Sequence, residues 1–251
     1  MPPDSNGDPL KIAVLSDVHG NLPAFKAVLE AVKAEDFDRV WFLGDLVGYG
    51  AFPDECVEMA AENCHICLAG NHDLGVLGRI DIADFSAHAA EAARWTRDHV
   101  GRGTLDFLGS LKPQRDGEAI GLWHASPRDP VWEYVLSIPQ AGECIDSMDA
   151  RVGAVGHTHV ACWFNQDGDG PTGDAAMEGL HQELSTGQWL LNPGSVGQPR
   201  DGDPRAAWLE LDTETWEATY HRVDYEIDQA ADAIRKAKLP GLLADRLYAG
   251  Q

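Results

Sequence analysis

Three short apolar runs near the amino terminus alternate with stretches of helical periodicity. The runs are Lys11–Ser16, Arg39–Leu43 and His65–Ala69. Each has the continuous apolar composition of a strand that is buried on both faces. Apolar residues recur at helical spacing over 22–32, with Asn21 as a candidate N-cap and Pro23 in the first turn. A second helix is expected after Pro53, and this alternation of strands and helices predicts a parallel sheet in an α/β fold.

The rest of the chain supplies further strands and helices. The expected strands cover residues 119–123, 152–155, 160–164, 189–191, 206–211 and 215–222, the last two as an antiparallel hairpin around 212–214. Helices are expected at 84–100, at 105–111, and from Tyr225 with a break at Pro240. The Gly- and Asp-rich stretch 165–187 predicts a surface excursion and not a linker between domains. We therefore expect a flexible tail over residues 1–9 and a single domain over residues 10–251.

Polar residues follow five of the predicted strands at the point where each strand ends. They are Asp17 and His19, Asp45, Asn71 and His72, His124, and His157 and His159. In open α/β sheets, ligands bind outside the carboxyl ends of the strands. Two histidines two residues apart point the same way on an extended backbone, and Gly156 beside them leaves room for a close approach. Each motif alone has an ordinary structural explanation, but five of them at strand ends point to a metal centre.

The number and type of these donors indicate which metals the centre holds. The candidate ligands are Asp17, His19, Asp45, Asn71, His124, His157 and His159. Seven oxygen and nitrogen donors exceed the needs of one ion and suit two divalent ions that share a carboxylate, ~3.5–4 Å apart. Donors of this kind without a thiolate favour transition metals over Ca²⁺, with Mn²⁺ expected first and Fe, Zn²⁺, Ni²⁺ or Co²⁺ as alternatives.

The strand-end motifs together resemble those of a known superfamily. The motifs DVHGN, GDLVGYG, GNHD, WHASP and GHTH resemble the calcineurin-like metallophosphoesterase superfamily, and NPGSVGQPRDGDPRA resembles its small bacterial and archaeal phosphodiesterase branch. The resemblance covers roughly Lys11 to Arg222. It implies a four-layer α/β/β/α sandwich of two mixed β-sheets flanked by helices. It also implies hydrolysis of a small phosphodiester or phosphomonoester by a hydroxide that bridges two metal ions.

The resemblance also implies a role for each motif residue. One metal would be held by Asp17, His19, Asp45 and His159, and the other by Asp45, Asn71, His124 and His157. Asp45 would bridge the two ions. His72 matches the residue that donates a proton to the leaving group.

One departure from the family pattern changes the expected substrate. Phosphoprotein phosphatases and dinucleoside tetraphosphatases carry an acid and an arginine in GDxVDRG, where this chain has Gly48 and Tyr49. A nucleotidase or dinucleoside-polyphosphate hydrolase remains the alternative enzyme, and a non-catalytic scaffold is a third hypothesis that the complete ligand set opposes. Tyr49, Arg128 and Arg200 are candidate substrate contacts. For each arginine, the alternative is a surface salt bridge.

Composition restricts the partners that the chain can bind. The formal net charge is −22, from 41 acidic against 19 basic residues. Such a surface repels nucleic acids and anionic lipids, so we expect a small phosphate ester as the partner and neither a nucleic acid polymer nor a membrane. No apolar run approaches membrane-spanning length, which favours the cytoplasm, and assembly into a homo-oligomer stays open.

The cysteines do not form a disulfide framework by their number or spacing. There are five of them: Cys56, Cys64, Cys67, Cys144 and Cys162. An odd number without regular spacing argues against paired bridges. Cys64 and Cys67 have the spacing of half a zinc site or of a redox pair, but no second pair completes a zinc site. We expect them to be small apolar residues that enter a strand.

Overall fold

Two six-stranded mixed sheets pack face to face in the computed structural model, which describes residues 9–117 and 119–251. The first sheet has the order β3 (Ile66–Cys67), β2 (Arg39–Phe42), β1 (Lys11–Leu15), β11 (Ala206–Asp212), β12 (Glu217–Val223) and β9 (His181–Glu183). The second has the order β4 (Gln114–Arg115), β5 (Ile120–Trp123), β6 (Val152–Ala154), β10 (Gln188–Pro193), β7 (Ala161–Asp167) and β8 (Gly170–Ala175). Strands β1 to β3 are parallel, as are β5, β6 and β10, and the other pairings are antiparallel. The predicted tail at 1–9 lies outside the described residues except for Pro9.

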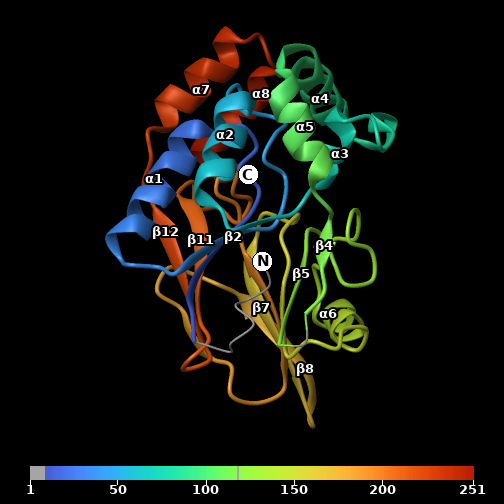
Figure 1. Cartoon of the computed structure of the whole chain (residues 1–251), viewed down its shortest axis with the longest axis vertical. Coiled ribbons are helices and arrows are strands. Elements are labelled where there is room, and N and C mark those ends of the chain that lie inside the picture. Colours follow the sequence, from blue (N-terminus) through green and yellow to red (C-terminus); the bar gives the residue numbers. More distant parts are fainter. Residues whose placement is uncertain (1–8, 118) are drawn as a thin grey trace.

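Helices cover the outer faces of both sheets. They are α1 (Leu22–Ala34), α2 (Pro53–Asn63), α3 (Asn71–Val76), the 3₁₀ helix η1 (Ile82–Asp84), α4 (Ala87–His99), α5 (Arg102–Ser110), α6 (Ile138–Ile145), α7 (Ile227–Lys236) and α8 (Gly241–Ala249). Helices α1, α2 and α5 pack on the first sheet and α6 on the second (Figure 1). The predicted four-layer α/β/β/α sandwich is therefore confirmed. Across the described ranges, no helix has the length and apolar character needed to cross a bilayer.

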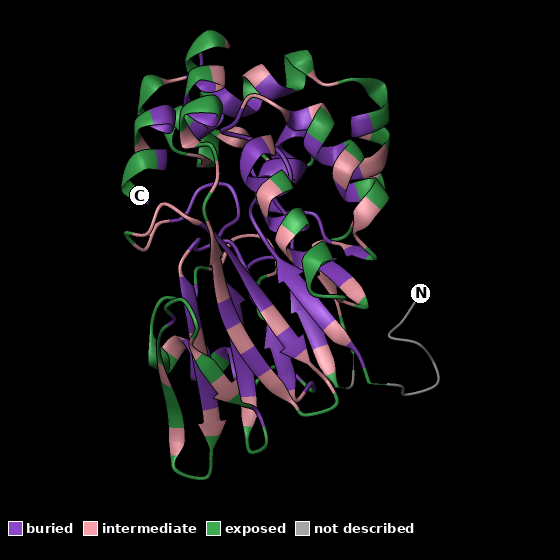
Figure 2. Ribbon diagram, turned by 90° about the vertical axis from the view of Figure 1, so that its left-hand side faces the viewer, coloured by how far each residue is buried: buried purple, intermediate pink, exposed green. Residues whose placement is uncertain are grey.

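The strands alternate their side chains between two apolar layers. In β1, Ile12 and Val14 lie in the cluster between the two sheets, whereas Ala13 and Leu15 pack under the helices. Because side chains alternate along a strand, a run that is apolar throughout can serve both layers. Figure 2 shows the consequence: buried residues predominate in the central strands, whereas exposed ones lie on the outer faces of the helices and on the outermost strands. This rigid frame holds the loops at the upper ends of the strands.

Several local predictions are confirmed, and others need correction. The Asn21 side chain accepts a hydrogen bond from the Ala24 N–H at 3.2 Å, so Asn21 caps α1 as predicted. The stretch 165–187, predicted as a surface excursion, contains two strands that were not predicted, β8 and β9, which pair with β7 and β12. Both are largely exposed edge strands, which lack the apolar alternation that marks a strand in a sequence. The short helices α3 and α6 were also missed. All five cysteines are free thiols.

Candidate metal centre

The parallel strands of both sheets end at one shared edge, where their polar residues meet. Main-chain hydrogen bonds tie the loops together there. The N–H of Asp17 donates to the Gly44 carbonyl at 3.0 Å, and that of His19 donates to the Asp45 carbonyl at 2.9 Å. Within the second sheet, the Gly156 N–H donates to the His124 carbonyl at 2.8 Å, and across the two sheets the Val196 N–H donates to the Ser16 carbonyl at 3.0 Å. The fold therefore converts motifs that are distant in sequence into one cluster.

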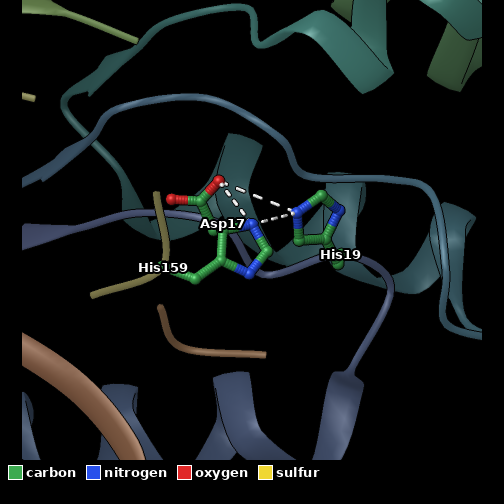
Figure 3. A group of neighbouring side chains, drawn as sticks. All are labelled: Asp17, His19 and His159. Carbon is green, nitrogen blue, oxygen red and sulfur yellow. Dashed lines mark hydrogen bonds and ion pairs between the residues drawn. The ribbon is translucent and has the colours of Figure 1, made fainter. Parts of the chain in front are cut away.

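The first group of donors consists of Asp17, His19 and His159 (Figure 3). Nδ1 of His19 lies 3.0 Å from the Val47 carbonyl, and Nδ1 of His159 lies 2.6 Å from the Gln198 carbonyl. Each Nδ1 must then carry the hydrogen, which leaves the Nε2 atoms as acceptors. These two Nε2 atoms are 3.0 Å apart, and Asp17 Oδ1 lies 3.7 and 3.3 Å from them.

The second group of donors consists of Asp45, His124 and His157, with Asn71 beside them. Nδ1 of His124 lies 3.0 Å from the Leu43 carbonyl, so its Nε2 also faces the cluster as an acceptor. That Nε2 is 3.2 Å from Asn71 Oδ1 and 3.5 Å from Asp45 Oδ2. All seven predicted ligands are thus brought together. A third set of donors within reach of one another, His19, Asp45 and His72, overlaps these groups.

Asp45 lies between the two groups. Its Oδ2 is 3.6 Å from Nε2 of His19 in the first group and 3.5 Å from Nε2 of His124 in the second. Its Oδ1 accepts the His72 N–H at 2.8 Å, which fixes the carboxylate plane. The free oxygen therefore points at the space shared by both groups.

Several buried side-chain atoms of the cluster have no hydrogen-bond partner among the described residues. Asp17 Oδ1, Asp45 Oδ2 and His157 Nε2 have no hydrogen bond to any residue in 9–117 or 119–251. An unsatisfied buried polar atom costs about 1–3 kcal/mol, and more if it is charged. The facing Nε2 lone pairs of His19 and His159 add a repulsion. Divalent cations would satisfy all these atoms at once, so the donor set fits metal ions.

Burial shapes the protonation of the cluster. Burial lowers the pKa of His19, His124, His157 and His159, that of His159 to about 3, so these imidazoles are neutral and free to ligate. Burial raises the pKa of Asp45 well above its usual value, and the charges of Asp73 and Asp17 raise it further. Burial would also raise the pKa of Asp17, but His159 and His19 hold it well below its usual value. Bound cations would favour the ionised form of both carboxylates.

The ligand loops have left-handed backbone conformations. Five ligands have positive φ: Asp17 (55°), His19 (49°), Asp45 (62°), His157 (64°) and His159 (61°). The expectation that an extended backbone points both histidines of GHTH the same way is therefore wrong. β6 ends at Ala154, and the two side chains join different donor groups. Such residues cost about 1–3 kcal/mol each and persist where the surroundings enforce them, typically at functional sites.

Neighbouring loops enforce this backbone. A Cβ at Gly156 would overlap Ser16 Oγ. Gly156 therefore permits the close approach of the loop that begins at Ser16 and carries Asp17. Ser195 Oγ donates to the Asp17 carbonyl at 2.8 Å, and Asn192 Nδ2 donates to the Gly156 carbonyl at 2.8 Å. The sequence analysis gave these two residues no role, although both stand in the NPGSVGQ motif.

Asp73 is a further residue that the sequence analysis missed. Its fully buried carboxylate accepts N–H groups from Asp45 and Gly70, both at 2.9 Å, and from Val47 at 3.1 Å. Burial raises the pKa of Asp73 to about 6, against these hydrogen bonds. Asp73 thereby fixes the loop that carries Asp45. The motif GNHD contained the signal, because its last residue is an acid in the first turn of a short helix.

His72 projects from the first turn of α3 into a cage of rings. Its ring centroid lies 4.4 Å from that of Tyr49, 4.7 Å from Phe85 and 4.8 Å from His19. Its Nδ1 packs against Gly48, where a Cβ would clash with it. Burial and nearby positive groups lower the pKa of His72 well below its usual value. Aromatic rings, and not a carboxylate at position 48, thus surround the His72 imidazole.

The three candidate substrate contacts differ in their surroundings. Arg200 Nη2 lies 3.4 Å from Tyr49 Oη and donates to Gln198 Oε1 at 3.0 Å, at the edge of the cluster. Tyr49 is buried between His19 and His72. Arg128, by contrast, forms ion pairs with Glu133 (2.6 Å) and Glu143, which is the salt-bridge alternative considered above.

Comparison with known proteins agrees with this geometry. Residues 10–214 match the model of the calcineurin-like phosphoesterase superfamily domain. The chain belongs to the calcineurin-like phosphoesterase superfamily. An uncharacterized protein from Methanocaldococcus jannaschii is 36% identical over 246 residues, covering 96% of this chain and 98% of that protein.

Two solved structures of similar size share the fold. A metallophosphoesterase from Sphaerobacter thermophilus is 36% identical, with a TM-score of 0.88 over 97% of this chain and 100% of that one. A hypothetical protein from Pyrococcus horikoshii is 20% identical, with a TM-score of 0.79 over 96% of this chain and 98% of that one. The superfamily assignment, with bacterial and archaeal relatives, therefore stands.

Proposed function

We propose that this calcineurin-like phosphoesterase hydrolyses a small phosphodiester or phosphomonoester with two divalent transition-metal ions, Mn²⁺ first among them. One observation carries the proposal: the free Oδ2 of Asp45 lies 3.6 and 3.5 Å from a histidine of each donor group. A single carboxylate oxygen between two sets of neutral imidazoles suits a shared ligand of two ions. The −22 charge of the chain supports a small ester over a nucleic acid polymer.

Each residue of the cluster has a separate proposed role. Asp17, His19 and His159 would hold one ion, Asn71, His124 and His157 the other, and Asp45 both. When bound, the ions supply an activated water near neutral pH and positive charge for the phosphate oxygens. Arg200, at the edge of the cluster, would bind a phosphate oxygen through its guanidinium.

His72 would donate a proton to the leaving oxygen. Its Nδ1 packs against Gly48, and the centroid of its ring lies 4.8 Å from that of His19 in the first donor group. Burial, together with nearby positive groups, lowers the pKa of His72 and keeps the imidazole neutral in the free site. A bound phosphate anion would oppose the effect of the positive groups and raise that lowered pKa.

The packing of His72 on Gly48 can be tested by Gly48→Ala. The added methyl group clashes with the His72 imidazole, and φ of +89° strains any residue but glycine. We expect kcat for alkyl esters to fall by about 10- to 100-fold, towards the effect of losing a general acid, with metal content retained. Gly170→Ala is the matched control, because its φ is +102° and no atom lies near its Cβ. Equal kcat in both variants would contradict the packing role.

Turnover with and without metal tests the proposed function. We expect the protein to hydrolyse bis(p-nitrophenyl) phosphate or p-nitrophenyl phosphate, to lose this activity on chelation, and to regain it with added Mn²⁺. The reason is that the histidines and carboxylates of the cluster supply lone pairs for metal ions and no nucleophile of their own, so the metals are needed to activate the attacking water. Undiminished hydrolysis after complete metal removal, or no hydrolysis of any ester by metal-loaded protein, would contradict the proposal.

A further inference from the structure

An exposed aromatic ring lies directly on the metal centre. Tyr134 belongs to the irregular stretch between β5 and α6, and its ring stacks on that of His157, with centroids 4.0 Å apart and planes at 28°. Tyr134 is nevertheless 43% exposed. One part of its ring therefore covers a candidate metal ligand, while much of the side chain faces solvent.

The backbone on both sides of Tyr134 is fixed. The next residue, Val135, is only 2% exposed and packs in the apolar cluster under α6. The preceding residue, Glu133, accepts hydrogen bonds from Ser126 Oγ at 2.5 Å and from Arg128 Nη2 at 2.6 Å. The ion pair of Arg128 thus anchors this segment. An exposed ring on a fixed backbone loses little conformational entropy when a ligand packs on it.

Arg200 connects this ring to the expected position of the phosphate. The Arg200 main-chain N–H donates to the His159 carbonyl at 3.0 Å, and its Nη2 lies 3.4 Å from Tyr49 Oη, so Arg200 borders the same cluster of donors on which Tyr134 stacks. A phosphate held between the cluster and Arg200 would carry its organic substituent past Tyr134.

We propose that Tyr134 is a substrate-recognition residue whose exposed surface stacks on an aromatic or heterocyclic substituent of the phosphate ester. This inference rests on the phosphoesterase function proposed above. Aromatic rings attract each other beyond the area that they bury, and any flat ring offers a surface for such stacking. Among diesters with the same leaving group, those whose retained substituent is a flat ring are then preferred over those whose retained substituent is aliphatic.

Three diesters that share one leaving group test the role of Tyr134. They are thymidine 5′-(p-nitrophenyl) phosphate, phenyl p-nitrophenyl phosphate and ethyl p-nitrophenyl phosphate. With Mn²⁺-loaded protein, we expect Tyr134→Ala to raise KM for the thymidine and phenyl esters by about 3- to 30-fold more than for the ethyl ester. Tyr134→Phe should keep most of the preference, because it retains the ring. Tyr248→Ala, which removes a similarly exposed tyrosine (45%) from α8, should leave all three KM values as in wild type.

Two results would overturn the recognition role. One is an equal rise in KM for all three esters, with or without loss of metal, which would make Tyr134 only a cover for His157. The other is no change in any KM. A binding measurement separates this inference from the proposed function. Phenyl phosphate should bind wild type more tightly than ethyl phosphate does, whereas the two compounds should bind Tyr134→Ala with equal affinity. Equal binding of both by wild type contradicts the stacking, whereas absence of turnover with all three diesters and with p-nitrophenyl phosphate contradicts the phosphoesterase function.

Discussion

Asp45→Asn is expected to remove metal from both donor groups and to abolish turnover. Asp45 supplies the oxygen that lies 3.6 Å from His19 and 3.5 Å from His124, together with a negative charge that two cations would share. An amide of the same shape loses that charge, so both ions are held less tightly. We expect metal content to fall below one ion per chain and kcat to fall by at least about 10³-fold. Elemental analysis and steady-state kinetics measure both.

Asp106→Asn is the matched control for this substitution. Asp106 is exposed on α5, where it forms an ion pair with Arg102 of the same helix. We expect wild-type metal content and rate in this variant, since exposed pairs contribute little. An Asp45→Asn protein that keeps two ions and a near-normal rate would show that Asp45 does not bridge.

His72→Ala is expected to lose rate in proportion to the difficulty of the leaving group. An alkoxide of high pKa needs a proton in the transition state, whereas nitrophenolate leaves without one. General acid catalysis contributes about 10²- to 10⁴-fold, so kcat/KM for alkyl esters should fall within that range and for nitrophenyl esters far less. Because Gly48 supplies no carboxylate to orient the imidazole, and rings hold it instead, we expect the low end.

The measurement is kcat/KM for wild type and His72→Ala over a series of leaving-group pKa values, with metal content checked in each. His99→Ala is the control, because His99 lies on the surface of α4, where its Nδ1 hydrogen-bonds to the Trp95 carbonyl of the same helix. Diverging slopes support the acid role. Parallel slopes for wild type and His72→Ala would assign His72 to transition-state binding or to structure instead.

The clustering of the candidate ligands could be predicted from sequence because each follows a predicted strand. Asp17, Asp45 and His124 follow continuous apolar runs, and parallel strands deliver their ends to one edge. The two sheets and their helices could not be derived from periodicity alone, and the sandwich followed from the resemblance. Strands β8 and β9 escaped prediction because their residues are mostly exposed, so no apolar alternation marks them.

The shape of the site depends on contacts between distant loops, which no local pattern reports. The left-handed backbone of His157 and His159 is supported by contacts of Gly156 with Ser16, just after β1, and with Asn192, near the end of β10. Likewise, the position of Tyr134 on the candidate metal centre follows from the burial of Val135 in a cluster to which β5, α6, β7 and β10 contribute. Such residues become visible only once the chain is folded.

The most direct test of the metal centre is a crystal structure of the Mn²⁺-loaded protein with anomalous scattering data. We expect two peaks about 3.5–4 Å apart, one on either side of Asp45 Oδ2. Asp17, His19 and His159 should contact the first ion, and Asn71, His124 and His157 the second. A single fully occupied peak, or a pair of ions that Asp45 does not contact, would contradict a dinuclear centre bridged by this carboxylate.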